Sequence, residues 1–166
     1  FLSDLNEADA LIHVIDTAGA TNEKGEQSEP GKFDPANDIR FLDYELDMWY
    51  YQIMMRGWEK FARSVMQENQ EVYKSIAKQL SGLRVTENMV KEAIDKFPKD
   101  VTKWSEQDLK QLASVLRKRS KPMLIAANKL DIPIAAENIE RLKKQFPEYT
   151  IIGCSADFEL ALKEAN

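Results

Sequence analysis

Apolar residues form short continuous runs near both ends of the chain and recur at three- and four-residue steps between them. The runs at 10–16, 121–128 and 149–156 have the length and composition of buried strands. Residues 34–120 carry helical spacing, as does the amphipathic segment 136–146 between the last two runs. Strand, helix and strand at this spacing predict parallel pairing in an α/β fold.

The central block is expected to form four helices. Asp34 followed by Pro35 is a typical helix start, and Ser105 with Asp108 has capping-box spacing at the start of the fourth helix. A gap in the apolar spacing near Gly57 indicates a bend in the first helix. The expected helices cover 34–61, 72–80, 86–97 and the residues from 105 onward, with a further helix at 157–165 and the end of one at 1–9.

This pattern predicts a parallel sheet of about three strands and a large all-helical insertion. Residues 1–20 and 121–166 would carry the sheet, and residues 34–120 would form the insertion. Residues 20–33, rich in Gly, Pro, Asn and Glu, would form a surface loop. Because the run at 10–16 is almost continuously apolar, we expect its strand to be covered on both faces.

Composition narrows the class of protein. The chain has 166 residues, 43% of them hydrophobic and 31% charged, which fits a folded domain with a sizeable core. Its net charge of −5 disfavours a nucleic-acid surface, and no apolar run approaches the roughly 18 residues that span a bilayer. Cys154 is the only cysteine, as expected of a cytoplasmic protein. Because the first residue is Phe1, we interpret the chain as a piece of a longer one.

Asn128, Lys129 and Asp131 directly follow the second apolar run. Ligands of open α/β sheets bind beyond the carboxyl ends of the strands, so a ligand is expected at this loop. The Asp131 carboxylate can accept two parallel hydrogen bonds, from N1–H and the 2-amino group of guanine. Adenine offers neither donor. Since hydrogen bonds to charged groups contribute roughly 1.5–3 kcal/mol each, the motif predicts selectivity for guanine.

Neighbouring residues complete the predicted base site. The Asn128 amide can donate to guanine N7 and tie the loop to its neighbours, and the aliphatic stem of Lys129 can lie along the base plane. Ser155 and Ala156 follow the third run and are of the residue type whose backbone N–H meets guanine O6. The alternative is structural: Asn128 and Asp131 would cap a helix start, and Lys129 would be solvated.

The stretches "FLSDLNEADALIHVIDTAG", "MLIAANKLD" and "IIGCSADFELALKEA" resemble the Obg-like, YchF-related GTP-binding proteins, particularly their archaeal members. The resemblance implies part of a P-loop GTPase domain (Rossmann-like) of the translation-factor class, interrupted by a helical domain. Relatives with an altered base motif prefer ATP, so the intact Asn-Lys-Leu-Asp implies GTP or GDP. Asp157 departs from the lysine or small residue that GTPases often have after Ser-Ala.

The same resemblance bears on "DTAG" at 16–19, which has the Asp-x-x-Gly spelling of a Mg²⁺-binding GTPase motif. In this family the corresponding segment follows switch II, so we interpret 16–19 as the end of a strand that enters a loop. The resemblance also implies a GTP/GDP switch that works in the cytoplasm with the ribosome or the translation machinery.

The phosphate-binding motif Gly-x-x-x-x-Gly-Lys-Ser/Thr is absent from the sequence. "GEQSEPGKF" at 25–33 has five residues between its glycines and Phe after the lysine. Phosphate and Mg²⁺ binding are therefore assigned to a missing first half, with no catalytic or metal-binding residue in this chain. The parent protein would be a GTP hydrolase, whereas these 166 residues alone are not expected to hydrolyse GTP or to bind it tightly.

Three further hypotheses concern partners. Without the missing half, the strand at 10–16 would have an open edge, where two copies of the chain could pair into a dimer. The whole chain could instead be a helical protein- or ribosome-interaction module in which the sheet is only scaffold. The basic run "RKRSK" at 117–121 is interpreted as a solvated helix end, with an RNA contact as the alternative.

Overall fold

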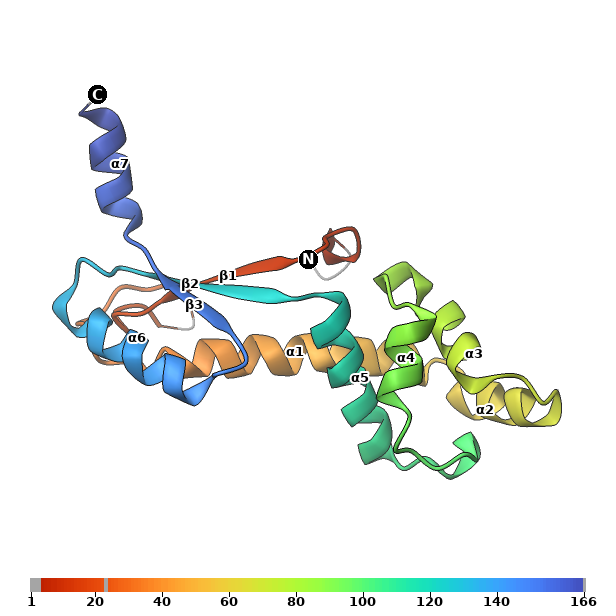
Figure 1. Cartoon of the computed structure of the whole chain (residues 1–166). Helices are drawn as coiled ribbons and strands as arrows, with labels where there is room; N and C mark the ends of the chain where they lie inside the picture. The colour runs from red at the N-terminus through yellow and green to blue at the C-terminus, as the bar shows by residue number, and fades with distance from the viewer. Residues whose placement is uncertain (1–3, 23, 166) are drawn as a thin grey trace. The chain divides into compact units, whose positions relative to one another are not determined.

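The three apolar runs form the strands of one parallel sheet in a computed structural model that describes residues 4–22 and 24–165 (Figure 1). The strands are β1 (Leu11–Asp16), β2 (Met123–Asn128) and β3 (Thr150–Gly153). They lie in the order β1-β2-β3, and both neighbouring pairs are parallel. The expected α/β class, with about three parallel strands and a large helical stretch, is confirmed.

Helices account for most of the rest of the described residues. They are α1 (Ala36–Met55), α2 (Trp58–Gln67), α3 (Val72–Gln79), α4 (Glu87–Ala93), α5 (Glu106–Ser120), α6 (Pro133–Gln145) and α7 (Ala156–Glu164). Gly57, with φ of 74°, lies at the predicted break, but α1 and α2 are separate helices there, so the block expected to form four helices forms five, α1 to α5. Ser105 and Asp108 form the predicted capping box. The apolar spacing predicted a helix over 86–97, but α4 ends earlier, at Ala93.

Contacts between residues divide the described chain into two compact units. The helical unit comprises residues 4–10 and 43–122, and the sheet unit comprises residues 11–42 and 123–165. Helix α1 therefore contributes its first residues to the sheet unit and the remainder to the helical unit. Each unit has a hydrophobic core of its own.

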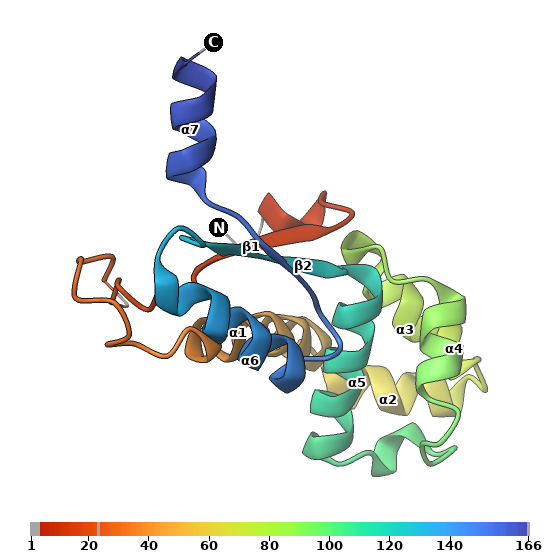
Figure 2. The same ribbon diagram turned by 60° about the vertical axis from the view of Figure 1, so that its left-hand side comes forward.

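The sheet unit buries one face of its sheet. Ile125 and Ile151 are buried in a cluster with Ile39 of α1 and with Ile139 and Leu142 of α6. Figures 1 and 2 show α6 and the start of α1 on the same side of the strands. This packing provides the core on which the loops at the strand ends rest.

The opposite face of the sheet is open among the described residues. Ile12 and Val14 of β1 are 72% and 62% exposed, and Ile152 of β3 is 51% exposed. The expectation that β1 is covered on both faces is therefore wrong for this chain. Helix α7 has no buried residue and extends away from the strands in Figure 2. Its exposed apolar side chains are Phe158, Leu160 and Leu162.

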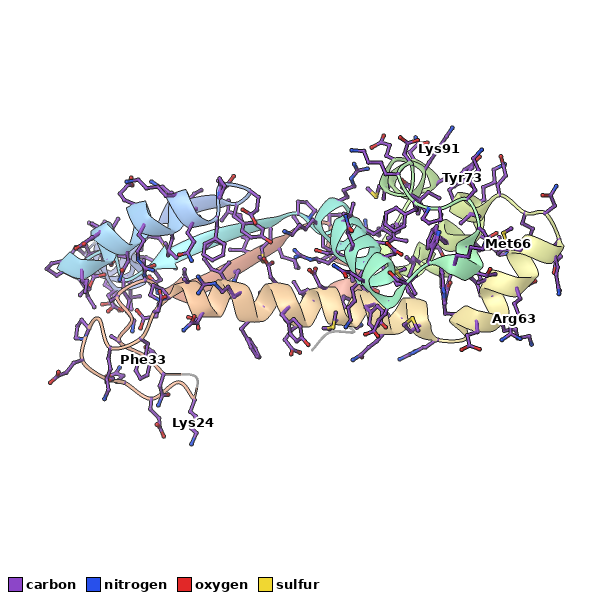
Figure 3. All side chains as sticks on the ribbon, turned by 90° about the horizontal axis from the view of Figure 1, so that it is seen from below. Lys24, Phe33, Arg63, Met66, Tyr73 and Lys91 are labelled. Carbon is purple, nitrogen blue, oxygen red and sulfur yellow. The ribbon has the colours of Figure 1, made fainter. Side chains whose placement is uncertain are left out.

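The core of the helical unit is aromatic. The rings of Trp58 and Trp104 stack with centroids 5.8 Å apart, and Tyr50 and Met54 are fully buried. Much of the aromatic and methionine cluster of α1 and α2 therefore packs inside the unit. Tyr73 lies at the surface end of this packing, with the Lys91 ammonium 5.7 Å from its ring centroid; both are labelled in Figure 3.

Two of the four cations in the basic run at 117–121 are buried. Arg117 has no exposed surface, and its guanidinium donates to Asp47 Oδ1 at 2.8 Å and to Asp43 Oδ1 at 3.0 Å on α1. Lys121 is 1% exposed. A solvated helix end and an RNA contact are therefore both wrong for these two cations, although Lys118 and Arg119 remain exposed.

Lys121 and Arg84 bind the segment that precedes β1. The Lys121 ammonium donates to the carbonyl oxygens of Asn6, at 2.8 Å, and Ala8. Burial lowers the pKa of Lys121, and the nearby positive charge of Arg84 lowers it further. Arg84 pairs with Asp9. The helix end expected at 1–9 is a single 3-10 turn, Asp4–Asn6, within residues 4–9, and residues 1–3 of the expected helix lie outside the described part.

None of the helices in the described ranges combines the length and the hydropathy that a membrane crossing requires.

Replacing Arg117 by Met should lower the free energy of unfolding of the helical unit by about 3 kcal/mol, since two partly buried carboxylates would lose their cation. All three tryptophans, at 49, 58 and 104, lie in this unit, so urea unfolding can be followed by their fluorescence. Arg119→Met is the matched control. Arg119 is on α5, like Arg117, and its replacement removes an exposed pair with Glu92 of α4, which should cost about 1 kcal/mol or less. Equal losses for the two variants would contradict the prediction.

Candidate nucleotide-binding site

The carboxyl ends of the three strands meet at one edge of the sheet. Parallel register places Asp16 beside Asn128, and Ala127 beside Gly153. The loop after β2 and the loop after β3 are joined by a hydrogen bond from the Leu130 N–H to the Cys154 carbonyl, at 3.0 Å. The five residues predicted to bind a base, at 128, 129, 131, 155 and 156, therefore lie in or at the ends of two adjoining loops.

Asn128 connects these two loops through its side chain. Its Oδ1 accepts a hydrogen bond from the Ala156 N–H at 3.0 Å. Ala156 is the first residue of α7, and it belongs to the Ser155–Ala156 pair from which a backbone N–H is expected to meet guanine O6. In this structure that N–H is engaged by Asn128, so a base carbonyl would have to share it.

Asp131 is exposed, and its carboxylate is hydrogen-bonded to Ser155 in the other loop. Its Oδ1 accepts a hydrogen bond from the Ser155 hydroxyl at 2.5 Å. The residue at the cap of α6 is Ile132, and no side chain caps that helix. Asp131 therefore does not cap α6, and its carboxylate faces solvent beside Ser155 and Ala156. The alternative holds for Asn128, whose Oδ1 accepts from the first residue of α7.

Lys129 points toward the loop that follows β1. Its Nζ donates to Asp16 Oδ2 and to Thr21 Oγ1, both at 2.9 Å. Its backbone is left-handed, with φ of 68°. The alternative of a solvated lysine is wrong, since the side chain is 32% exposed and ion-paired. Sequence reasoning did not find Asp16 or Thr21 as neighbours of the motif, although parallel pairing of the two strands places Asp16 opposite Asn128.

The Asp16 carboxylate is held by its own loop. Oδ1 accepts from the Ala18 N–H and Oδ2 from the Ala20 N–H, each at 3.0 Å. Burial raises the pKa of this carboxyl, but the Thr21 hydroxyl, the Lys129 ammonium and the Ala20 amide together outweigh burial and hold the pKa below its ordinary value of 3.8. The ionised carboxylate therefore stabilises the folded chain at neutral pH, and this stabilisation is lost as the pH falls below about 4.

The loop itself is tightly folded at Gly19. Gly19 has φ of 61°, and a Cβ at this position would lie 2.1 Å from the Phe33 carbonyl oxygen. The Phe33 N–H donates to the Gly19 carbonyl at 3.1 Å. Phe33 is labelled in Figure 3. Only glycine fits this position, so the returning segment at residue 33 fixes the loop that carries Ala18, Ala20 and Thr21.

Comparison with known proteins finds relatives for the part of the chain that carries these loops. Residues 126–166, which contain β3, α7 and both base-site loops, match the family model described as "Obg-like GTPase YGR210-like, G4 motif-containing domain". This segment is therefore similar to the G4-motif domain of Obg-like GTPases. The match begins in β2, two residues before Asn128.

Related proteins extend the likeness over the whole chain. A GTP-binding protein of Methanocaldococcus jannaschii is 49% identical over 166 residues, which are 100% of this chain and 42% of that protein. A GTP-binding protein of Schizosaccharomyces pombe is 27% identical over 98% of the chain and 40% of its own length. The crystal structure of a GTP-binding protein from Pyrococcus horikoshii OT3 superposes with a TM-score of 0.89 at 44% identity, over 99% of this chain and 48% of that one. The chain thus spans less than half the length of these relatives.

Replacing Gly19 by Ala should destabilise the sheet unit by about 3 kcal/mol or more, because the methyl group overlaps a backbone oxygen and the backbone is left-handed. Faster amide hydrogen exchange in β1 and β2 would report this change. Gly25→Ala is the matched control: φ there is 80°, but a Cβ meets nothing within 4 Å. It should cost only about 1 kcal/mol. Similar exchange in the two variants would show that the contact with Phe33 does not matter.

Proposed function

We propose that the loops at 128–131 and 155–156 bind the guanine base of GTP or GDP, and that the chain is the base-recognition part of a larger Obg-like GTPase. The observation that carries the proposal is the exposed Asp131 carboxylate beside Ser155, at the carboxyl edge of a parallel sheet. The family match over 126–166 supports it, as do relatives named as GTP-binding proteins.

Each predicted residue takes a role that its position permits. Asp131 accepts hydrogen bonds from N1–H and the 2-amino group of guanine. Asn128 holds the two loops together through Ala156 and presents its amide to N7. The Lys129 stem forms a wall along the base plane, and the Ala156 N–H contacts O6. Adenine would leave the Asp131 carboxylate unpaired, which accounts for selectivity.

Phosphates and Mg²⁺ are assigned to the part of the protein that the longer relatives have beyond these 166 residues. The open face of the sheet, with Ile12, Val14 and Ile152, is the surface that this part would cover. In that whole protein we expect GTP hydrolysis and, from the family resemblance, a switch that works with the ribosome or the translation machinery in the cytoplasm. The chain alone should bind nucleotide weakly, because most contacts to the phosphates are missing.

Asp131→Asn should exchange guanine preference for xanthine preference, because a carboxamide donates to the xanthine 2-carbonyl where the carboxylate accepted from an amino group. The test is an NMR titration of the chain with GMP, XMP and AMP, read at the backbone amides of 128–131 and 155–156. GMP affinity should fall about tenfold. Asp157→Asn, which removes the same charge from the first turn of α7, should leave the order of preference unchanged.

Equal responses of the unaltered chain to GMP and AMP would contradict the proposal. In the alternative, the chain is an interaction module whose residues 43–122 bind a partner. That alternative predicts that Asp131→Asn leaves partner binding unchanged.

A second prediction concerns the edge of the sheet. β1 is an edge strand among the described residues, and its exposed side chains Ile12 and Val14 are apolar. Two copies of the chain are expected to pair there, so light scattering should show a dimer at high concentration. Val14→Lys adds a charge at an exposed position of β1 and should shift the chain to monomer. A monodisperse monomer of the unaltered chain would refute edge pairing.

A further inference from the structure

Asp16 is arranged to hold a cation before any ligand arrives. Its two carboxylate oxygens are oriented by the N–H groups of Ala18 and Ala20, each at 3.0 Å. The side chain is 13% exposed. The strand fixes its backbone on one side, through pairing with Asn128, and the close packing of Gly19 against Phe33 fixes the loop on the other. The carboxylate therefore has little freedom to change direction.

The cation that it holds belongs to the base-recognition loop. Lys129 Nζ lies 2.9 Å from Asp16 Oδ2 and 2.9 Å from Thr21 Oγ1. A free lysine side chain is flexible, and fixing it upon ligand binding costs conformational entropy. Here the two acceptors restrict the side chain in the unliganded protein, so that this cost is met on folding instead of on binding.

The bonds also bear on the Asp-x-x-Gly spelling of residues 16–19. A Mg²⁺ ligand needs carboxylate oxygens directed at the metal. Both oxygens of Asp16 are directed at backbone N–H groups of its own loop, and one of them also accepts from Lys129. The geometry suits an acceptor for an ammonium group.

We propose that Asp16, assisted by Thr21, is a positioning residue for guanine binding: it holds Lys129 so that the methylene stem of the lysine forms a preformed wall of the base site. This inference rests on the proposed function, since it assigns the wall to a guanine site. Asp16 acts through Lys129 and does not itself contact the base.

The test uses the same GMP titration with two variants of different severity. Asp16→Asn keeps the size of the side chain and one acceptor for Ala18, but places an amide where Lys129 and Ala20 donate. GMP affinity should fall about tenfold, the effect of losing one charged hydrogen bond. Thr21→Val leaves the carboxylate and its loop bonds intact and removes only the second acceptor. Affinity should fall by about threefold.

Asp34→Asn is the matched control. Asp34 also accepts from an N–H two residues on, at Ala36, and pairs with an arginine, Arg141, at 2.7 Å. It lies in the sheet unit but is not bonded to Lys129. Because its pair with Arg141 is more exposed than that of Asp16 with Lys129, its replacement should cost less stability than Asp16→Asn, and GMP affinity should stay unchanged.

A spectroscopic measurement separates positioning from general stability. The ammonium protons of Lys129 are held by two acceptors and should give an observable, slowly exchanging ¹H–¹⁵N signal in the unliganded chain. That signal should disappear in Asp16→Asn and persist in Asp34→Asn. Lys143, in an exposed pair with Glu140, should give no such signal in any variant.

The outcomes separate the inference from the proposed function. If the unaltered chain shows no response to GMP at residues 128–131, both are overturned. If it binds GMP, and Asp16→Asn binds it equally well, the guanine site stands and the positioning role is refuted. If Asp34→Asn weakens GMP binding as much as Asp16→Asn, the effect is one of stability and the positioning role is refuted as well.

Discussion

Parallel pairing of β1 with β2 is the constraint on which the candidate site depends. It places Asp16 beside Asn128, although more than a hundred residues of chain separate them. Because parallel strands end at the same edge, the loop after β1 and the loop after β2 emerge together, and Lys129 can reach Asp16 and Thr21. An antiparallel neighbour would have put these groups at opposite ends of the sheet.

A connection of this length is tolerated because it folds around a core of its own. Closing a long loop costs only slightly more entropy than closing a short one. Residues 43–122 bury Tyr50, Met54 and the stacked Trp58 and Trp104, so the connection does not depend on the sheet for its hydrophobic burial. A connection with this property leaves the register of β1 and β2 undisturbed.

Local patterns predicted the elements because their causes are local. The apolar runs located all three strands, and the capping box at Ser105 and the glycine break at residue 57 come from short-range hydrogen bonding and backbone geometry. The position of the two base loops at strand ends also followed, since residues 128–131 and 155–156 each come directly after or at the end of an apolar run. Which nucleotide these loops bind remains a prediction.

The sequence could not predict which distant residues contact one another, or which segment covers each face of the sheet. Arg117 was interpreted as solvated because its neighbours are basic, whereas two aspartates on α1 make its burial possible. Continuous apolarity in β1 indicated cover on both faces, but it cannot say which segment supplies the cover. The pair of Lys129 with Asp16 depends on strand order, which no periodicity encodes. Lys121 shows one result of such distant contacts. It stands two residues before β2, and its ammonium binds the carbonyls of Asn6 and Ala8, just ahead of β1. These hydrogen bonds therefore connect the residues just before β1 with the residues just before β2. If one strand slipped by a single residue, these bonds would break at the amino ends of the strands, and Asp16 would no longer lie opposite Asn128 at the carboxyl ends.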